Sequence, residues 1–335
     1  MRIAVDARAA ARDGAGPGRY LRELLDAIDE RGHRHEVVRC VRSGEVRAAA
    51  RAGGCDVLLA GHSYLPACVA RVPVVQLVHD LVTLHPELGP RRRSVLAENP
   101  VRGRALRRAA AVITVSETTA AELRGVAPET ADRVTVVLPA VPRALALATA
   151  QEPFGIPGGG FVLAVGTIEP RKNLGRLAAA YERLPATLRE THPLVVAGAE
   201  GWRTRESVNA LRALRGACRR LGPVTDAELA ELYGRCTLLC YPSLGEGFGL
   251  PVLEAMHFGA AVVTSDRSSL PEVAGGAAEL VDPTDAGAIA AGLAHVLGDP
   301  AHRHELERRG LERAASFDWA RSADRALAVL EGAAG

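Results

Sequence analysis

Two glutamates stand eight positions apart in the segment Ser243–Ala255, with Glu246 before a pair of glycines and Glu254 after it. Gly247 and Gly249 let the backbone approach a ligand closely, and their amides lie near the start of an expected helix. Carboxylates placed in this way are suited to accept hydrogen bonds from sugar or ribose hydroxyls. A loop charge at Glu246 and a helix-dipole carboxylate at Glu254 explain the spacing equally well.

A single lysine stands among the 41 basic residues, and it lies in the segment Gly166–Asn173. The arginine-rich composition indicates that arginine has replaced lysine at positions where either side chain is acceptable. Lys172 is therefore a candidate for a place that needs a compact ammonium and has no room for a guanidinium. The segment follows an apolar run and precedes a helical pattern, and such turns bind phosphate in open sheets. The alternative is that chance preserved this one lysine.

Two further candidates lie in the first half of the chain. The segment Gly14–Tyr20 follows the first apolar run but does not match G-x-G-x-x-G, so a dinucleotide site is not expected. A plain flexible turn is the alternative reading of this segment. His79 ends an apolar run, where parallel sheets bind ligands, and His62 is a secondary candidate nearby in sequence.

The elements that must position these residues follow a regular plan. Short apolar runs alternate with helical patterns, which is typical of parallel sheets flanked by helices. In the first half the expected strands are Ile3–Asp6, Glu36–Val41, Val57–Ala60, Val74–His79, Ala111–Val115 and Val134–Leu138. In the second half they are Phe161–Val165, Leu194–Ala197, Arg219–Leu221, Thr237–Tyr241, Ala261–Thr264 and Glu279–Val281.

This plan predicts an α/β protein of two doubly wound, Rossmann-like domains, residues 1–150 and 151–335. The stretch Pro139–Gly160, rich in proline and glycine, is the expected connection. The carboxyl edges of both sheets are expected to face a central cleft, because such edges bind ligands.

Composition narrows the class of protein. Hydrophobic residues make up 48% and charged residues 24%, which is typical of globular chains. No apolar run reaches the roughly 18 residues of a membrane span, and the first residues enter a strand pattern without a signal peptide. Six cysteines lack a C-x-x-C pair, so we expect reduced core thiols in a cytoplasmic protein and no metal cluster.

The net charge of +2 conceals a basic stretch. Between Arg91 and Arg108 seven arginines accompany only one acidic residue, Glu98. A solvated helix face and an anionic partner, such as a membrane surface or a charged acceptor, are both compatible with this run. Nucleic acid is not expected, because interleaved aromatic residues and known binding motifs are absent.

The stretch Phe161–Pro283 resembles the donor-binding domain of the retaining glycosyltransferases of family four, which have the GT-B architecture. The likeness is strongest in Val165–Leu174, Tyr241–Gly259 and Leu270–Pro283. It implies that Glu246 lies beside the donor sugar and that Glu254 binds the ribose hydroxyls of the nucleotide.

The resemblance also assigns the surrounding residues. The backbone amides of four residues would hold the sugar and the diphosphate: Gly247, Phe248, Gly249 and Leu250. Lys172 matches the family's phosphate-binding turn. Thr167 stands where many members carry an arginine, and Arg171 is the candidate second cation. The version Gly-Thr-x-Glu-Pro-Arg-Lys-Asn is similar to that of bacterial enzymes that use GDP-mannose or related deoxyhexose donors.

The first half resembles the acceptor domain of the family more loosely. The likeness implies that Gly16 approaches the donor diphosphate, that Gly18 and His62 lie at the acceptor, and that His79 contacts the transferred sugar. Residues 1–150 would then form the acceptor domain and 151–335 the donor domain, with the C-terminal helix packing back onto the first.

The implied activity is transfer of a hexose or deoxyhexose, with retention, from a nucleotide-diphosphate sugar to a glycan, lipid-linked or natural-product acceptor. Neither a cofactor nor a metal is expected, since a D-x-D motif is absent. An epimerase or phosphorylase of the same architecture and a catalytically silent nucleotide-sugar-binding partner remain alternatives. The expected location is the cytoplasm or the inner face of the membrane.

Overall fold

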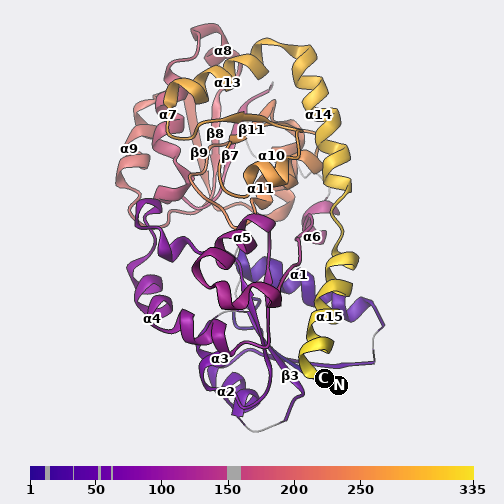
Figure 1. The fold of residues 1–335 in the computed structure, drawn as a ribbon. Helices are drawn as coiled ribbons and strands as arrows, with labels where there is room; N and C mark the ends of the chain where they lie inside the picture. The colour runs from indigo at the N-terminus through magenta and orange to yellow at the C-terminus, as the bar shows by residue number, and fades with distance from the viewer. Residues whose placement is uncertain (12–15, 33, 52–53, 62, 149–159) are drawn as a thin grey trace. The chain divides into compact units, whose positions relative to one another are not determined.

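The computed structural model describes residues 1–335 except 12–15, 33, 52–53, 62 and 149–159. The described residues form two compact units (Figure 1). The first comprises Met1–Pro86, Pro90–Pro142 and Asp318–Gly335, and the second comprises Glu87–Gly89 and Arg143–Phe317. The boundary expected between residues 150 and 151 lies outside the described residues.

Each unit contains a six-stranded sheet whose recorded strand pairs are all parallel, which confirms the predicted fold class. The first sheet has the order β2-β1-β3-β4-β5-β6 and the second β12-β11-β10-β7-β8-β9. The strands are β1 Arg2–Asp6, β2 Glu36–Cys40, β3 Val57–Ala60, β4 Val74–Val78, β5 Ala111–Thr114, β6 Val134–Val136, β7 Val162–Val165, β8 Leu194–Ala197, β9 Cys218–Gly222, β10 Leu238–Tyr241, β11 Ala261–Ser265 and β12 Glu279–Val281. All twelve expected strands are present, and their ends differ from the expected ends by at most two residues.

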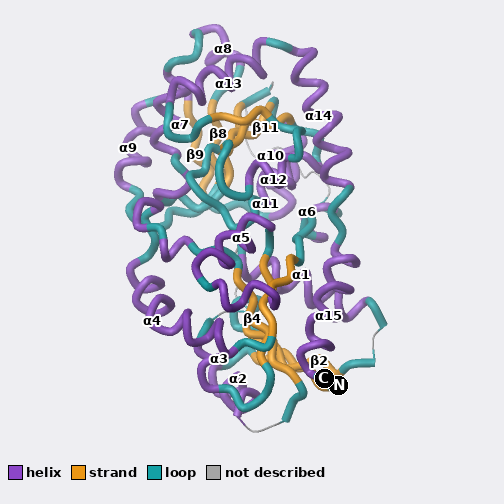
Figure 2. Tube along the Cα trace, in the orientation of Figure 1, coloured by secondary structure: helices purple, strands orange, loops and turns teal. Residues whose placement is uncertain are grey.

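Helices border the strands of each sheet (Figure 2). In the first unit α2 and α3 pack together beside β1 and β4, and α15 packs on β3, β4 and β5. The helices of this unit are α1 Pro17–Glu30, α2 Ser43–Arg51, α3 Leu65–Val69, α4 Arg92–Arg108, α5 Glu117–Val126 and α15 Trp319–Ala334.

In the second unit α7, α9 and α13 share one apolar core with the sheet, whereas α11 and α14 pack on β11 and on one another. The helices of this unit are α6 Arg143–Ala146, α7 Leu174–Glu182, α8 Ala186–Thr191, α9 Arg205–Ala213, α10 Asp226–Arg235, α11 Leu250–His257, α12 Leu270–Ala274, α13 Ala286–Gly298 and α14 Pro300–Ala315.

The C-terminal helix belongs to the first unit. Figure 1 shows α15, in yellow, beside α1, in indigo, and the two helices are in contact. The indole Nε1 of Trp319 donates to the carbonyl of Val141 at 2.9 Å, and its ring lies 5.6 Å from that of Tyr20. These contacts pack the first turn of α15 against α1 and against the segment that follows β6.

Local sequence signals set several helix starts. Ser116 caps α5 by accepting from the amide of Thr119 at 3.0 Å. Thr225 and Glu228 form a capping box at the start of α10. Pro251 lies in the first turn of α11, where its missing amide proton costs no helical hydrogen bond.

All six cysteines are unpaired, and four of them are buried. Among the described helices, each is too short or too polar to traverse a lipid bilayer.

Candidate functional site

The predicted phosphate turn and the first glutamate meet at the switch point of the second sheet. The chain runs from β7 to β8 and β9 on one side and returns to β10, β11 and β12 on the other. β7 and β10 are therefore parallel neighbours, and the loops that follow them share one carboxyl edge. The amide of Leu244 donates to the carbonyl of Arg171 at 2.8 Å. Asn173 Nδ2 donates to Pro242 O at 3.0 Å, which ties the two loops together.

Lys172 lies within this joint and is almost enclosed. Its Nζ donates to Glu246 Oε1 at 2.7 Å and also contacts the hydroxyl of Tyr241. The ammonium lies 4.8 Å from the centre of the Tyr241 ring. Gly166 allows this packing, because at its φ of 128° a Cβ would lie 3.3 Å from Lys172 Cε. The single lysine of the chain therefore occupies a confined position.

Arg171 is the second cation of the cluster. It donates to Glu169 Oε1 at 2.6 Å and to the carbonyl of Gly245 at 2.9 Å, and it contacts Glu246 Oε2. Glu169 is only 3% exposed, so its charge is held inside the loop. Arg171 is thus paired with two carboxylates in this state.

Burial and neighbouring charges have opposite effects on the pKa values of Glu246 and Lys172. Burial alone would raise the pKa of Glu246, but the charges of Arg171 and Lys172 lower it to about 2. Burial lowers the pKa of Lys172, and the nearby carboxylate acts against that shift. With Glu169 included, two cations face two carboxylates, and the formal charge of the cluster is zero. An anion gains more of the attraction of the two cations when Glu246 turns away from them, although Glu169 still offsets part of the charge of Arg171.

Hydroxyl groups hold Glu246 in place from several sides. Ser243 Oγ donates to Glu246 Oε1 at 2.6 Å, and the Tyr241 hydroxyl donates to the same oxygen at 2.8 Å. The backbone of Glu246 exchanges hydrogen bonds with Ser268 Oγ, at 3.0 Å from its amide and 2.7 Å from its carbonyl. Burial raises the pKa of Tyr241 well above its ordinary value, so the hydroxyl keeps the proton that it donates.

Glu254 lies on α11 and has a different partner. Its Oε2 accepts a hydrogen bond of 2.8 Å from the hydroxyl of Tyr233, which is on α10. Both residues are buried, and burial raises the pKa of Tyr233 well above its ordinary value. The ring of Tyr233 stacks on Phe258 at a centroid distance of 5.9 Å. The two glutamates are thus supported by separate groups.

The glycine-rich turn between the glutamates is tightly constrained. Gly249 has a φ of 110°, and a Cβ there would lie 2.6 Å from a methyl group of Leu270. It directly precedes α11, whose first amides have no intrahelical acceptors. The ring of Phe248 packs edge-on against Phe317 at 5.7 Å. Gly247 is buried, and Leu250 begins the helix.

The remaining predicted residues are placed as follows. Thr167 is half-buried, and its methyl group lies against Gly201, where a Cβ would approach it to 2.7 Å. In the first unit His79 follows β4 and meets the ring of Tyr20 edge-on at 5.3 Å. Gly16 precedes α1 with a φ of 73°. A Cβ at Gly18 would lie 2.5 Å from the carbonyl oxygen of Ala9, so its lack of a side chain serves backbone packing. His62 lies outside the described residues.

Sequence reasoning missed the groups that orient the charges. Tyr241 ends β10 at the carboxyl edge, and Ser243 lies inside the segment that drew attention to Glu246. Glu169 lies in the Lys172 turn. Their positions in the loops that hold Lys172 and Glu246 could have marked these three residues as candidates. Their contacts with the charged groups, however, depend on β7 and β10 being neighbours in the sheet.

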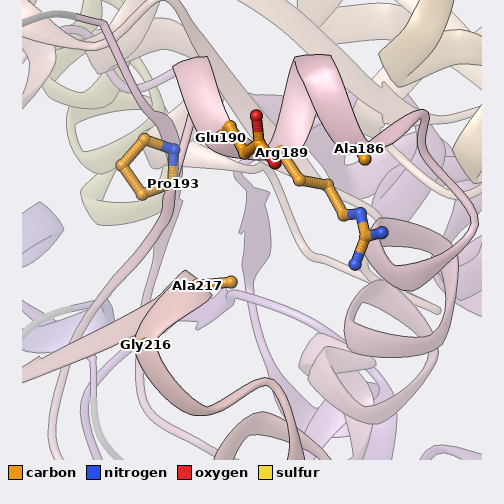
Figure 3. A pocket seen from close by; sticks show the side chains of 6 residues that line it. All are labelled: Ala186, Arg189, Glu190, Pro193, Gly216 and Ala217. Carbon is orange, nitrogen blue, oxygen red and sulfur yellow. The ribbon is translucent and has the colours of Figure 1, made fainter.

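A separate hollow of about 350 Å³ lies at the opposite end of the second sheet (Figure 3). It is lined by residues that precede β8 and β9: Ala186, Arg189, Glu190, Pro193, Gly216 and Ala217. Arg189 and Glu190 are its only charged lining residues. We therefore place the candidate site at the Lys172 and Glu246 cluster, where four charged groups and three hydroxyls converge.

Comparison with known proteins gives matches to glycosyltransferases over both halves of the chain. The description "Glycosyl transferases group 1" matches residues 149–313, and "Glycosyltransferase Family 4" matches residues 42–145. The O-antigen chain mannosyltransferase B of Escherichia coli is 36% identical over 266 residues, covering 76% of this chain and 69% of that protein. The serotype-specific mannosyltransferase WbdA of Escherichia coli is 35% identical over 232 residues, covering 66% of this chain but only 28% of WbdA. The structure of Anabaena HepE with UDP-glucose has a TM-score of 0.76 at 18% identity and covers 99% of both chains.

Proposed function

Because this chain belongs to the family-four glycosyltransferases of GT-B architecture, we propose that it transfers a hexose or deoxyhexose from a nucleotide-diphosphate sugar. We favour a donor of the GDP-mannose type. The acceptor would be a glycan, a lipid-linked saccharide or a natural product, and the transfer would proceed with retention and without a metal.

The observation that carries the proposal is the cluster of Lys172, Arg171 and Glu246 at the switch point of the second sheet. Switch points are where open α/β sheets bind nucleotides. The cations suit a diphosphate, and Glu246 suits the hydroxyls of the attached sugar. The mannosyltransferase names of the two Escherichia coli relatives support a mannose-type donor, and the HepE complex supports a nucleotide-sugar ligand.

The chemistry proposed for the cluster is electrostatic. As the bond between the sugar and the diphosphate breaks, negative charge grows on the departing phosphate, and Lys172 with Arg171 would stabilise it. Amides at the start of α11 would add to this stabilisation. Attack from the same face of the donor, with the leaving phosphate taking the acceptor proton, accounts for retention without a covalent intermediate. We also propose that His79 and Gly16 contact the donor and that Gly18 and His62 contact the acceptor.

A panel of nucleoside diphosphates tests the proposal directly. A ligand that binds the folded state raises the melting temperature by mass action, and we expect the largest rise with GDP. Incubation with GDP-mannose and candidate acceptors should then release GDP only when acceptor is present. Release of an epimer or a sugar phosphate would indicate an epimerase or a phosphorylase instead. Binding without turnover would indicate a silent binding partner.

We expect the Tyr233→Phe variant to bind nucleoside diphosphates about tenfold more weakly. The variant lacks the hydrogen bond that holds the Glu254 carboxylate, which is the proposed partner of the ribose hydroxyls. Under the proposed role of Glu254, the loss should disappear with a 2′,3′-dideoxynucleoside diphosphate, which lacks the ribose hydroxyls. Isothermal titration calorimetry measures both affinities. Tyr181→Phe is the matched control, because the Tyr181 hydroxyl donates to His192 O at 2.9 Å within the same unit. Equal weakening for both ligands would contradict the role given to Glu254.

The proposed peripheral membrane contact is based on α4. Arg92 and Arg93 are exposed, Leu96 is 75% exposed, and Arg102 is buried and therefore structural. At about 1 kcal/mol for each arginine, the double variant Arg92→Gln/Arg93→Gln should bind anionic vesicles about 30-fold more weakly at low salt. Cosedimentation measures this loss, and the α14 variant Arg308→Gln/Arg309→Gln is the control. Equal binding to neutral vesicles would contradict the contact.

A further inference from the structure

Two histidines and a glutamate lie close together at the amino end of β12, the edge strand of the second sheet. Glu279 begins β12, His295 lies in the last turn of α13, and His302 lies in the first turn of α14. One ligand atom from each residue lies within 4.8 Å of the other two. We propose that this triad, Glu279, His295 and His302, binds a divalent transition-metal ion such as Zn²⁺.

The donor set suits this class of ion. Imidazole nitrogens and a carboxylate oxygen are common ligands of zinc, and a two-histidine, one-carboxylate set leaves a position for water. A sphere built only from oxygen would instead favour Mg²⁺ or Ca²⁺. The chemistry of the triad therefore selects a metal that binds nitrogen.

The distances also suit a tetrahedral ion. With metal–ligand bonds near 2.0 Å, neighbouring ligand atoms of a tetrahedron lie about 3.3 Å apart. Glu279 Oε1 lies 3.4 Å from His295 Nδ1, and Glu279 Oε2 lies 3.0 Å from His302 Nε2. The two imidazole rings are 4.2 Å apart and inclined by 12°. Because an imidazole binds a metal in the plane of its ring, one of the two stacked rings must turn about its χ2 angle before both nitrogens can reach one ion.

The surrounding structure fixes the backbone at two of the three ligand positions. Asp299 caps α14, and its Oδ1 accepts from the amides of Ala301 and His302 at 3.0 Å each. Glu279 is held by the pairing of β12 with β11, in which it lies opposite Val263. The side chains of Glu279 and His302 are only 24% and 28% exposed, so their freedom before binding is limited. A fixed backbone at these two positions reduces the conformational entropy that is lost when the metal binds.

The position of the triad gives the metal a structural role. Glu279 lies at the amino end of β12, whereas Lys172 and Glu246 follow the carboxyl ends of β7 and β10. The ion would link the edge strand to α13 and α14 and would take no part in sugar transfer. A metal at this triad is therefore compatible with the proposed metal-independent sugar transfer.

Zinc titration of the untagged chain tests the proposal. We expect one ion to bind per chain in calorimetry, and the melting temperature to rise by about 5 °C at 100 times the dissociation constant. EDTA should reverse the rise. His302→Gln and Glu279→Gln should abolish both effects, whereas His304→Gln on the same helix should retain them, because His304 lies outside the triad.

Two results would overturn the metal site: an unchanged melting temperature of the parent chain with zinc, or a full rise in His302→Gln. Stabilisation of His302→Gln by a nucleoside diphosphate, equal to that of the parent chain, shows that the variant is folded. Anomalous scattering at the zinc edge from soaked crystals gives a second readout, with the expected peak between the three side chains.

Discussion

Replacing Lys172 with alanine is expected to lower the rate of sugar transfer by about 10²- to 10³-fold, the usual cost of losing a preorganised electrostatic group. Under the proposed function, this ammonium stabilises the negative charge of the departing diphosphate. Steady-state release of the nucleotide from the donor, with acceptor present, measures the effect. An unchanged kcat/KM would refute the phosphate role of this turn.

Stability and size controls separate the role of Lys172 from damage to the fold. In Lys172→Ala the carboxylate of Glu246 still faces Arg171, so it keeps a cationic partner and the chain should fold. Lys172→Arg keeps the charge but must fit a wider head between Gly166 and the Tyr241 ring, and roughly tenfold loss is expected. Arg308→Ala, which removes an exposed charge from α14, should transfer at the parent rate.

The strands could be predicted because buried parallel strands read as continuous apolar runs. β3, Val57–Ala60, is buried at every position, and its predicted and observed limits agree. The order of strands could not be predicted in the same way. The neighbours β7 and β10 are joined by pairs such as Val162 and Leu238, which lie far apart in the sequence. Local patterns carry no information about such pairings.

The same distinction applies to the site. Lys172 and Glu246 stood out by residue type, context and resemblance, whereas their direct contact required the two loops to be adjacent. Glu246 and Glu254 stood out together by their spacing, and the structure gives them different partners. Glu254 contacts Tyr233 because α11 packs against α10, which the sequence between the glutamates does not encode.

Replacing Glu246 with glutamine should have opposite effects on binding and on transfer. In the described structure Glu246 offsets the charges of Lys172 and Arg171, so its neutralisation leaves an excess positive charge in an enclosed loop. A free nucleoside diphosphate should then bind more tightly than to the parent chain, because it no longer competes with the carboxylate. Removing one partner of a buried ion pair is also expected to lower the free energy of unfolding by about 3 kcal/mol.

Transfer by Glu246→Gln should nevertheless fall by about 100-fold, since the proposed contact with the sugar is a hydrogen bond to a charged acceptor worth about 3 kcal/mol. Calorimetry with GDP and turnover of GDP-mannose measure the two effects on one variant. Ser243→Ala is the matched control, because it removes the 2.6 Å hydrogen bond to Glu246 without changing any charge. Weaker GDP binding by Glu246→Gln would contradict the competition between carboxylate and diphosphate. Parent-like turnover would contradict the contact with the sugar, so each half of the argument fails on a separate measurement.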